Sequence, residues 1–112
     1  MIIEEVIKNF FDGHLNVPSF FEHELSMPDT FVMIERVGGS QKNKLPTARV
    51  AFQSYAPSLY EAAELNEKVK LVVESMVEED LVSGVRLNSD YNFTDIETRQ
   101  YRYQALYEIF YY

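Results

Sequence analysis

Histidine is the first residue type to consider for chemistry, because a neutral imidazole can bind a metal ion or transfer a proton near neutral pH. The chain has two histidines, His14 and His23, with Pro18 between them, and no nearby acidic pattern completes a zinc site. It has no cysteine, which excludes disulfides, thiolate metal ligands and cysteine nucleophiles. The sequence therefore predicts no metal centre.

Three further segments could suggest a catalytic or binding site, but local structure explains each of them better. Asp90–Asp95 is rich in side-chain oxygens, yet it lacks the central glycine and final glutamate of an EF-hand loop. Gly38-Gly39-Ser40 is followed neither by a helix pattern nor by the lysine of a phosphate-binding loop. Ser58 has no Gly-x-Ser-x-Gly context and fits a helix N-cap. We therefore expect no enzymatic activity and no cofactor.

Tyrosine offers the clearest functional signal, because eight tyrosines occur in 112 residues and five of them lie between Tyr101 and Tyr112. The β-favouring residues of this segment alternate with a period of two, which predicts a long strand. A tyrosine row on a strand packs in the core or pairs across strands, whereas tyrosine with arginine is also typical of protein interfaces. Both interpretations remain open. The candidate interface residues are Lys42, Lys44, Tyr101, Arg102, Tyr103 and Tyr107.

The composition limits the class of partner. The formal net charge is −8, from 10 basic and 18 acidic residues, and the basic residues are dispersed. Gripping phosphates requires a local excess of lysine and arginine, so nucleic acid is disfavoured as a main ligand. Acidic charge is compatible with docking onto a basic protein surface. No apolar run approaches the ~18 residues of a membrane span, and the acidic, amphipathic start predicts no signal peptide.

Hydrophobic periodicity predicts two helices and four or five strands. The first helix carries an apolar stripe from Ile2 to Phe11 and is expected to stop at Gly13. The main helix begins after Ser58, which with Glu61 has capping-box spacing, and Glu64 and Lys68 are expected to pair on its surface. Its predicted buried stripe is Leu59, Ala62, Ala63, Val69, Val72, Val73, Met76 and Val77.

The predicted strands are separated by polar segments. Gly38-Gly39 is expected to break a strand, and Gly38–Pro46 is predicted to be a mobile loop because residues 38–44 contain nothing apolar. Gly84 marks a possible bulge, and Ser89–Glu97 is predicted to be a loop. The strands are expected at Ser19–His23, Phe31–Val37, Thr47–Tyr55, Leu81–Asn88 and Tyr101–Tyr112.

This order of elements predicts the α+β class. Two helices should pack on one face of a mainly antiparallel four- to five-stranded sheet, within a single domain spanning residues 1–112. The other sheet face would carry tyrosine and arginine side chains, which is too aromatic a surface to be left entirely to water. The residues therefore favour a structural or assembly role.

Several motifs resemble the small tail-terminator proteins (tail-completion, or tail-to-head joining, proteins) of long-tailed bacteriophages and prophages, and the resemblance covers nearly the whole chain. The segment around Thr98 and the last strand, with Arg-Tyr-Gln-Ala at 102–105, is the closest match. The other segments that carry the resemblance are the opening helix, Val17–Glu22, Phe31–Glu35 with Gly38-Gly39, Gln53–Ala56, Ser58–Ala63 and Leu87–Asp95.

The resemblance implies a structural protein, typically a hexameric ring. Such a ring caps the finished tail tube, ends its polymerisation and presents a surface to the head. The implied partners are other copies of the chain, the tail tube protein and a head-completion or connector protein. The implied location is the host cytoplasm during assembly and then the neck of the virion. Two alternatives stay open: a head-completion or neck adaptor protein, and a small cytosolic binding module that uses the tyrosine-rich sheet face.

Overall fold

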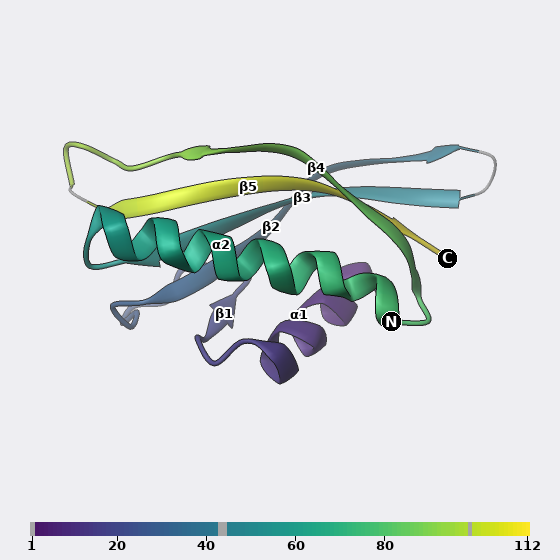
Figure 1. The fold of residues 1–112 in the computed structure, drawn as a ribbon, viewed down its shortest axis with the longest axis horizontal. Helices are drawn as coiled ribbons and strands as arrows, with labels where there is room; N and C mark the ends of the chain where they lie inside the picture. Colours follow the sequence, from purple (N-terminus) through teal and green to yellow (C-terminus); the bar gives the residue numbers. More distant parts are fainter. Residues whose placement is uncertain (1, 43–44, 99) are drawn as a thin grey trace.

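The computed structural model describes residues 2–42, 45–98 and 100–112. A five-stranded sheet has the strand order β1-β2-β3-β5-β4, and its neighbouring strands are antiparallel except for β1 and β2 (Figure 1). A 3₁₀ turn, Met76–Glu78, continues the second helix. The main elements are α1 (Ile3–His14), β1 (Ser19–Phe20), β2 (Phe31–Lys42), β3 (Leu45–Ala56), α2 (Leu59–Ser75), β4 (Val82–Asn92) and β5 (Tyr101–Tyr111).

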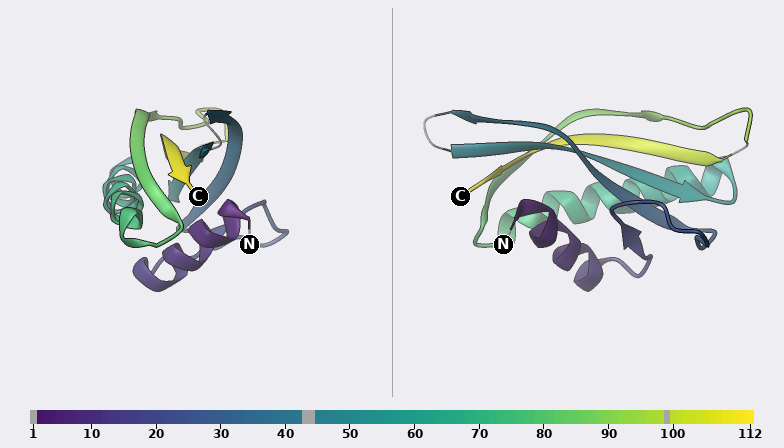
Figure 2. Two further views of the ribbon diagram at one scale, coloured as in Figure 1. Left: turned by 90° about the vertical axis from the view of Figure 1, so that its right-hand side faces the viewer. Right: turned by 180° about the vertical axis from the view of Figure 1, so that it is seen from behind.

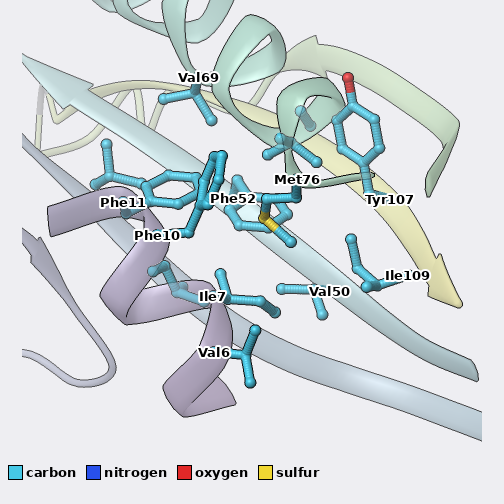
Figure 3. Close-up of a cluster of buried hydrophobic side chains, with 14 of the residues drawn as sticks. Val6, Ile7, Phe10, Phe11, Val50, Phe52, Val69, Met76, Tyr107 and Ile109 are labelled. Carbon is cyan, nitrogen blue, oxygen red and sulfur yellow. The ribbon is translucent and has the colours of Figure 1, made fainter. Parts of the chain in front are cut away.

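The predicted α+β class is confirmed, because both helices pack against the same face of the sheet. Phe52 on β3 is fully buried, and its ring stacks on Phe11 of α1 with centroids 5.2 Å apart. The same ring meets Tyr107 of β5 edge-on at 6.1 Å. Val69, which is labelled in Figure 3, and Val73 of α2 are also fully buried in this cluster. We call this side of the sheet the helical face.

Helix α1 extends further than the sequence predicts, since it continues through Gly13 to His14. The backbone N–H of Leu15 donates to the Phe11 carbonyl at 2.9 Å and closes the last turn. The ring of His14 stacks on Phe10, and its Nδ1 donates to the Phe10 carbonyl at 2.9 Å. The prediction that Gly13 ends the helix was therefore wrong, because the helix needs no left-handed residue there.

The prediction that Gly38-Gly39 ends a strand was also wrong, and residues 38–42 and 45–46 are paired strand instead of the predicted loop. Strand β2 continues past an irregularity between Arg36 and Gly38, and its pairing with β3 runs on to Lys42 and Leu45. A Cβ at Gly39 would lie 2.8 Å from the Thr47 carbonyl oxygen and 2.9 Å from the Arg36 guanidinium. Glycine therefore permits a close approach within the hairpin. Lys44 lies outside the described residues.

Helix α2 begins as predicted, with the Ser58 hydroxyl accepting from the Glu61 backbone N–H at 3.2 Å. Its buried stripe differs from the predicted one at both ends. Leu59 in the first turn and Val77 in the 3₁₀ turn are exposed, whereas Leu65 and Asn66 are buried. The predicted pair of Glu64 and Lys68 does not form.

Strand β4 extends to Asn92, so the predicted loop over 89–97 is shorter than expected. Ser89–Asn92 pair with β5, and the predicted bulge region at Gly84 is confirmed by a register shift between Val82 and Gly84. The molecule measures 44 × 25 × 24 Å. The β2–β3 hairpin and the connection between β4 and β5 lie at opposite ends of its long axis (Figure 1). The β2–β3 hairpin extends past the helices at one end (Figures 1 and 2).

The core arrangement gives a direct test of the helix face. Replacing Val73 with Asp places an unpaired charge in the apolar cluster, and we expect it to lower the free energy of unfolding by about 3–5 kcal/mol or more. The matched control is Leu71→Asp on the same helix, because Leu71 is 69% exposed. That change should stay within about 0.5 kcal/mol of wild type in urea denaturation. Equal effects of the two substitutions would show that the assigned face is incorrect.

Candidate interaction surface

The sheet face opposite the helices carries polar and aromatic side chains that connect three strands. We call it the open face. Its β3 residues are Arg49, Ala51, Gln53 and Tyr55, and its β5 residues are Arg102, Gln104, Leu106, Glu108 and Phe110. Since directly paired residues project to the same face, the register of β3 and β5 determines this set.

Arg102 organises one end of the open face. Its Nη1 donates to the Tyr55 hydroxyl at 2.7 Å, and its Nε donates to the Phe93 carbonyl at 2.7 Å. The guanidinium carbon lies 4.6 Å from the centre of the Phe93 ring, a cation–π geometry. Arg102 therefore ties β3 and β5 to the segment that follows β4.

The segment between β1 and β2 covers the same end of the open face from the other side. The ring of His23 meets Phe31 and Tyr55 edge-on, with centroids 6.1 and 5.7 Å away. Phe31, Met33 and Tyr55 are buried there, with Phe20 and Met27 packed against them. This end of the sheet is therefore shielded from solvent by the chain itself.

Side-chain amides cross the middle of the open face. Gln53 Nε2 donates to Gln104 Oε1 at 2.8 Å, and Gln104 in turn donates to the Tyr91 hydroxyl. The Tyr55 hydroxyl donates to Gln53 Oε1 at 3.3 Å. These bonds satisfy polar groups that the sheet half-buries, and they fix the side chains in one arrangement.

Glu108 forms the charged end of the open face. Its carboxylate accepts from Arg49 Nη2 at 3.2 Å and from Arg86, and the Arg86 guanidinium lies over the Phe110 ring at 5.8 Å. The hydrogen bonds from Arg86 and then Arg49 hold the pKa of Glu108 below its usual value of 4.5. The acid is therefore ionised and bridged between two strands at neutral pH.

Charge is distributed unequally over the molecule. Residues 3–14 and 59–80, which form the two helices and the turn after α2, contain ten acidic and three basic residues. The remainder of the sequence contains eight acidic and seven basic residues. Nearly all of the net charge of −8 therefore belongs to the helical layer, while the sheet and its connections are close to neutral.

The candidate interface residues from the sequence do not form one site. Tyr107 is 1% exposed and lies in the core, with its hydroxyl donating to Glu74 at 3.4 Å, so it is not available to a partner in this subunit (Figure 3). Burial, followed by the nearby Glu74 carboxylate, raises the pKa of its phenol. Tyr101 and Tyr103 share the helical face with Tyr107 but are half-exposed, whereas Arg102 is on the open face.

Of the two lysine candidates, Lys42 is described, and it lies far from the tyrosines along the sheet. Lys42 pairs with Leu45 at one end of the β2–β3 hairpin, whereas Tyr101 pairs with Ala56 at the opposite end of β3. Sequence reasoning did not identify Gln53, Glu108 or their partners. Alternation at 49–55 and 102–110 was visible, but the register that brings these positions together was not.

Comparison with known proteins adds no identification: no family model matches the sequence, and a search of curated proteins finds no significant match. No helix in the described parts of the chain is long and apolar enough to cross a membrane. Among residues 2–42, 45–98 and 100–112, no group of three or more ligand-type side chains could hold a metal ion.

The Glu108 bridge predicts a specific pH dependence. Its folded-state pKa is depressed, so its stabilisation is complete above the unfolded pKa and is lost as the pH falls through the folded value. Glu108→Gln should lower the free energy of unfolding at pH 7, and its difference from wild type should shrink toward zero as the pH falls through the depressed pKa of Glu108. Glu35→Gln, on the exposed part of β2, is the control and should show little difference at pH 7. A pH-independent effect of Glu108→Gln would contradict the bridge.

Proposed function

We propose that this chain is a structural phage or prophage protein that forms a ring on the tail tube, ends tail polymerisation and joins tail to head. The proposal rests first on the sequence resemblance, which spans both helices and most of the strands. It would act in the host cytoplasm during assembly and then remain in the neck of the virion. Its partners would be further copies of itself, the tail tube protein and a head-completion or connector protein.

The structural observation that best supports a ring is that the sheet has two different, largely unpaired edges. Strand β4 is an edge strand of 11 residues with β5 as its one neighbour. Strand β2 has 12 residues, and β1 pairs only with Val32 and Met33 along its outer side. Unpaired edges readily accept another strand, and soluble monomers usually block them.

Two unlike edges favour head-to-tail contacts. If β4 of one subunit meets β2 of the next, each subunit presents two different surfaces, which is a heterologous interface. Such an interface gives a closed ring when the rotation between subunits closes and a filament when it does not. A ring of identical subunits, expected to be a hexamer from the resemblance, satisfies this condition.

The remaining surfaces suit contacts above and below such a ring. The β2–β3 hairpin extends beyond the helices (Figure 1), where it could reach a neighbouring ring or tube. The acidic helical layer would favour a basic partner surface and would repel nucleic acid. A small-molecule binding module is less well supported, because Tyr55 and Tyr107 are buried and already hydrogen-bonded within the subunit.

Sedimentation and native mass spectrometry test the ring directly. Purified protein should contain a ring-sized species at high concentration or when mixed with tail tubes. Leu87→Lys places a charge on edge strand β4, where Leu87 is 44% exposed, and should shift the population to monomer. The matched control is Leu71→Lys on α2, which should still form the ring.

Two results would contradict the proposal. Strictly monomeric wild-type protein at millimolar concentration, with no binding to tail tubes, would exclude the tail-terminator role. Ring formation with binding to a head connector and none to tubes would instead support the head-completion alternative. Equal loss of assembly in both lysine variants would show that β4 is not the contact.

A further inference from the structure

Exposed apolar side chains gather at one end of the long axis of the molecule. Three segments lie there: residues 21–30 before β2, residues 57–61 at the start of α2 and residues 91–98 at the end of β4 and beyond (Figures 1 and 2). We call these segments the loop end. Half of the exposed large apolar side chains of the described chain belong to it: Phe21, Leu25, Leu59, Tyr60, Tyr91, Phe93 and Ile96. Single exposed apolar residues are normal, but a concentration of them typically marks a binding surface.

Contacts through β3 and β5 hold the three segments beside one another. The ring of His23 lies 5.7 Å from the ring of Tyr55. The Tyr55 hydroxyl accepts from Arg102 at 2.7 Å, and the same guanidinium lies 4.6 Å from the centre of the Phe93 ring. The start of α2 follows Ala56, which pairs with Tyr101 at the beginning of β5. The loop end is therefore one continuous region of the surface.

The segment that carries Ile96 is held in a defined turn. The backbone N–H of Glu97 donates to Asp95 Oδ1 at 3.1 Å, and Ile96 between them is 86% exposed. The ring of Tyr91 meets the ring of Phe93 edge-on, with centroids 5.8 Å apart. An ordered turn that already presents apolar side chains to solvent loses less conformational entropy when a partner covers them.

The charge of the loop end indicates the chemistry of that partner. Its three segments contain six acidic residues and no lysine or arginine, and even with Arg99, which follows the third segment, acids outnumber bases by six to one. Glu22, Glu24 and Glu97 are exposed and make no ion pair with any described residue. By contrast, residues 36–49, which include the β2–β3 hairpin at the opposite end, contain four basic and no acidic residues. The near-neutral sheet and connections therefore have a charge separation along the long axis.

We propose that the loop end docks a basic segment of a different protein, one that also carries apolar side chains. Apolar groups of that segment cover Leu25 and Ile96, while its lysines and arginines face the surrounding carboxylates. A second copy of this chain fits less well, because its basic residues 36–49 lie at the far end and such head-to-tail contacts would repeat without closing. Anionic lipid is disfavoured by the acidic charge. The inference goes beyond the ring proposal and does not depend on it.

Fluorescence anisotropy with three labelled peptides tests the chemistry of the site. The first is an amphipathic helical peptide of lysine and leucine, with the leucines on one face. In the second peptide glutamate replaces lysine, and in the third serine replaces leucine. The lysine–leucine peptide should bind saturably and more weakly as salt is added. The other two should bind about tenfold more weakly or not at all, since each lacks one half of the complementarity.

Substitutions on the protein locate the binding surface. Leu25→Ser and Ile96→Ser should each weaken the lysine–leucine peptide by about tenfold, as expected when the burial of one large aliphatic side chain is lost. Leu71→Ser is the matched control, because Leu71 is 69% exposed near the other end of α2. Glu97→Gln should weaken the peptide by about threefold, whereas Glu78→Gln in the 3₁₀ turn should leave binding unchanged. All five positions are exposed, so the fold should stay intact.

Four outcomes would overturn the proposal. Equal binding of the glutamate–leucine peptide would remove the basic requirement, and an equal effect of Leu71→Ser would show that the loop end is not the site. Self-association in sedimentation that Leu25→Ser abolishes would assign this end to a second copy. Binding to phosphatidylcholine vesicles that Ile96→Ser abolishes would assign it to a membrane.

The test is separate from that of the ring. Leu87→Lys, which is expected to disrupt ring assembly, lies outside the loop end and should leave binding of the lysine–leucine peptide unchanged. Loss of ring assembly with normal peptide binding would therefore count against the ring alone, and the reverse result against the docking site alone.

Discussion

The contact between Phe11, Phe52 and Tyr107 joins the elements on which the rest of the structure depends. Phe52 is on β3, the middle strand of the sheet, and it receives α1 through a stacked ring and β5 through an edge-on ring. Figure 3 shows these side chains together, with Val69 of α2 and Met76 of the 3₁₀ turn closing the cluster. Because all of these side chains are buried, both helices are held to a single face. The opposite face is thereby left without a helix.

The open face and the helical face are stabilised by different kinds of interaction. Dispersion and apolar burial hold the helices against the sheet. On the other face, the strands are joined by the Gln53–Gln104 hydrogen bond, by the bond from Arg102 to the Phe93 carbonyl and by the Arg49–Glu108 ion pair. Such polar contacts are worth little individually in water but fix the geometry when several are connected. The net negative charge lies mainly on the helical layer. The edges of the sheet are left as the natural sites for strand pairing.

The difference between the two faces of the sheet explains why the candidate interface residues do not lie together. Alternation along β5 sends Tyr107 into the core and Arg102 to the opposite face, although both are in one run of aromatic and basic residues. Tyr103 is on the helical face with Tyr107, but it lies beside the first turns of α2, where it and Tyr60 line a groove. Composition alone cannot distinguish these environments, because they depend on which element covers each strand position.

Local sequence determined the features that depend on neighbours along the chain. The apolar period of α1, the Ser58 cap and the alternation of Tyr101–Tyr111 are each set by spacing, so the α+β class followed from them. Tertiary structure alone decided the strand order, the continuation of β2 through Gly38-Gly39 and the partners of Lys70. Strand pairing and ion pairing join residues far apart in sequence, and no local period encodes which distant strand will supply the partner.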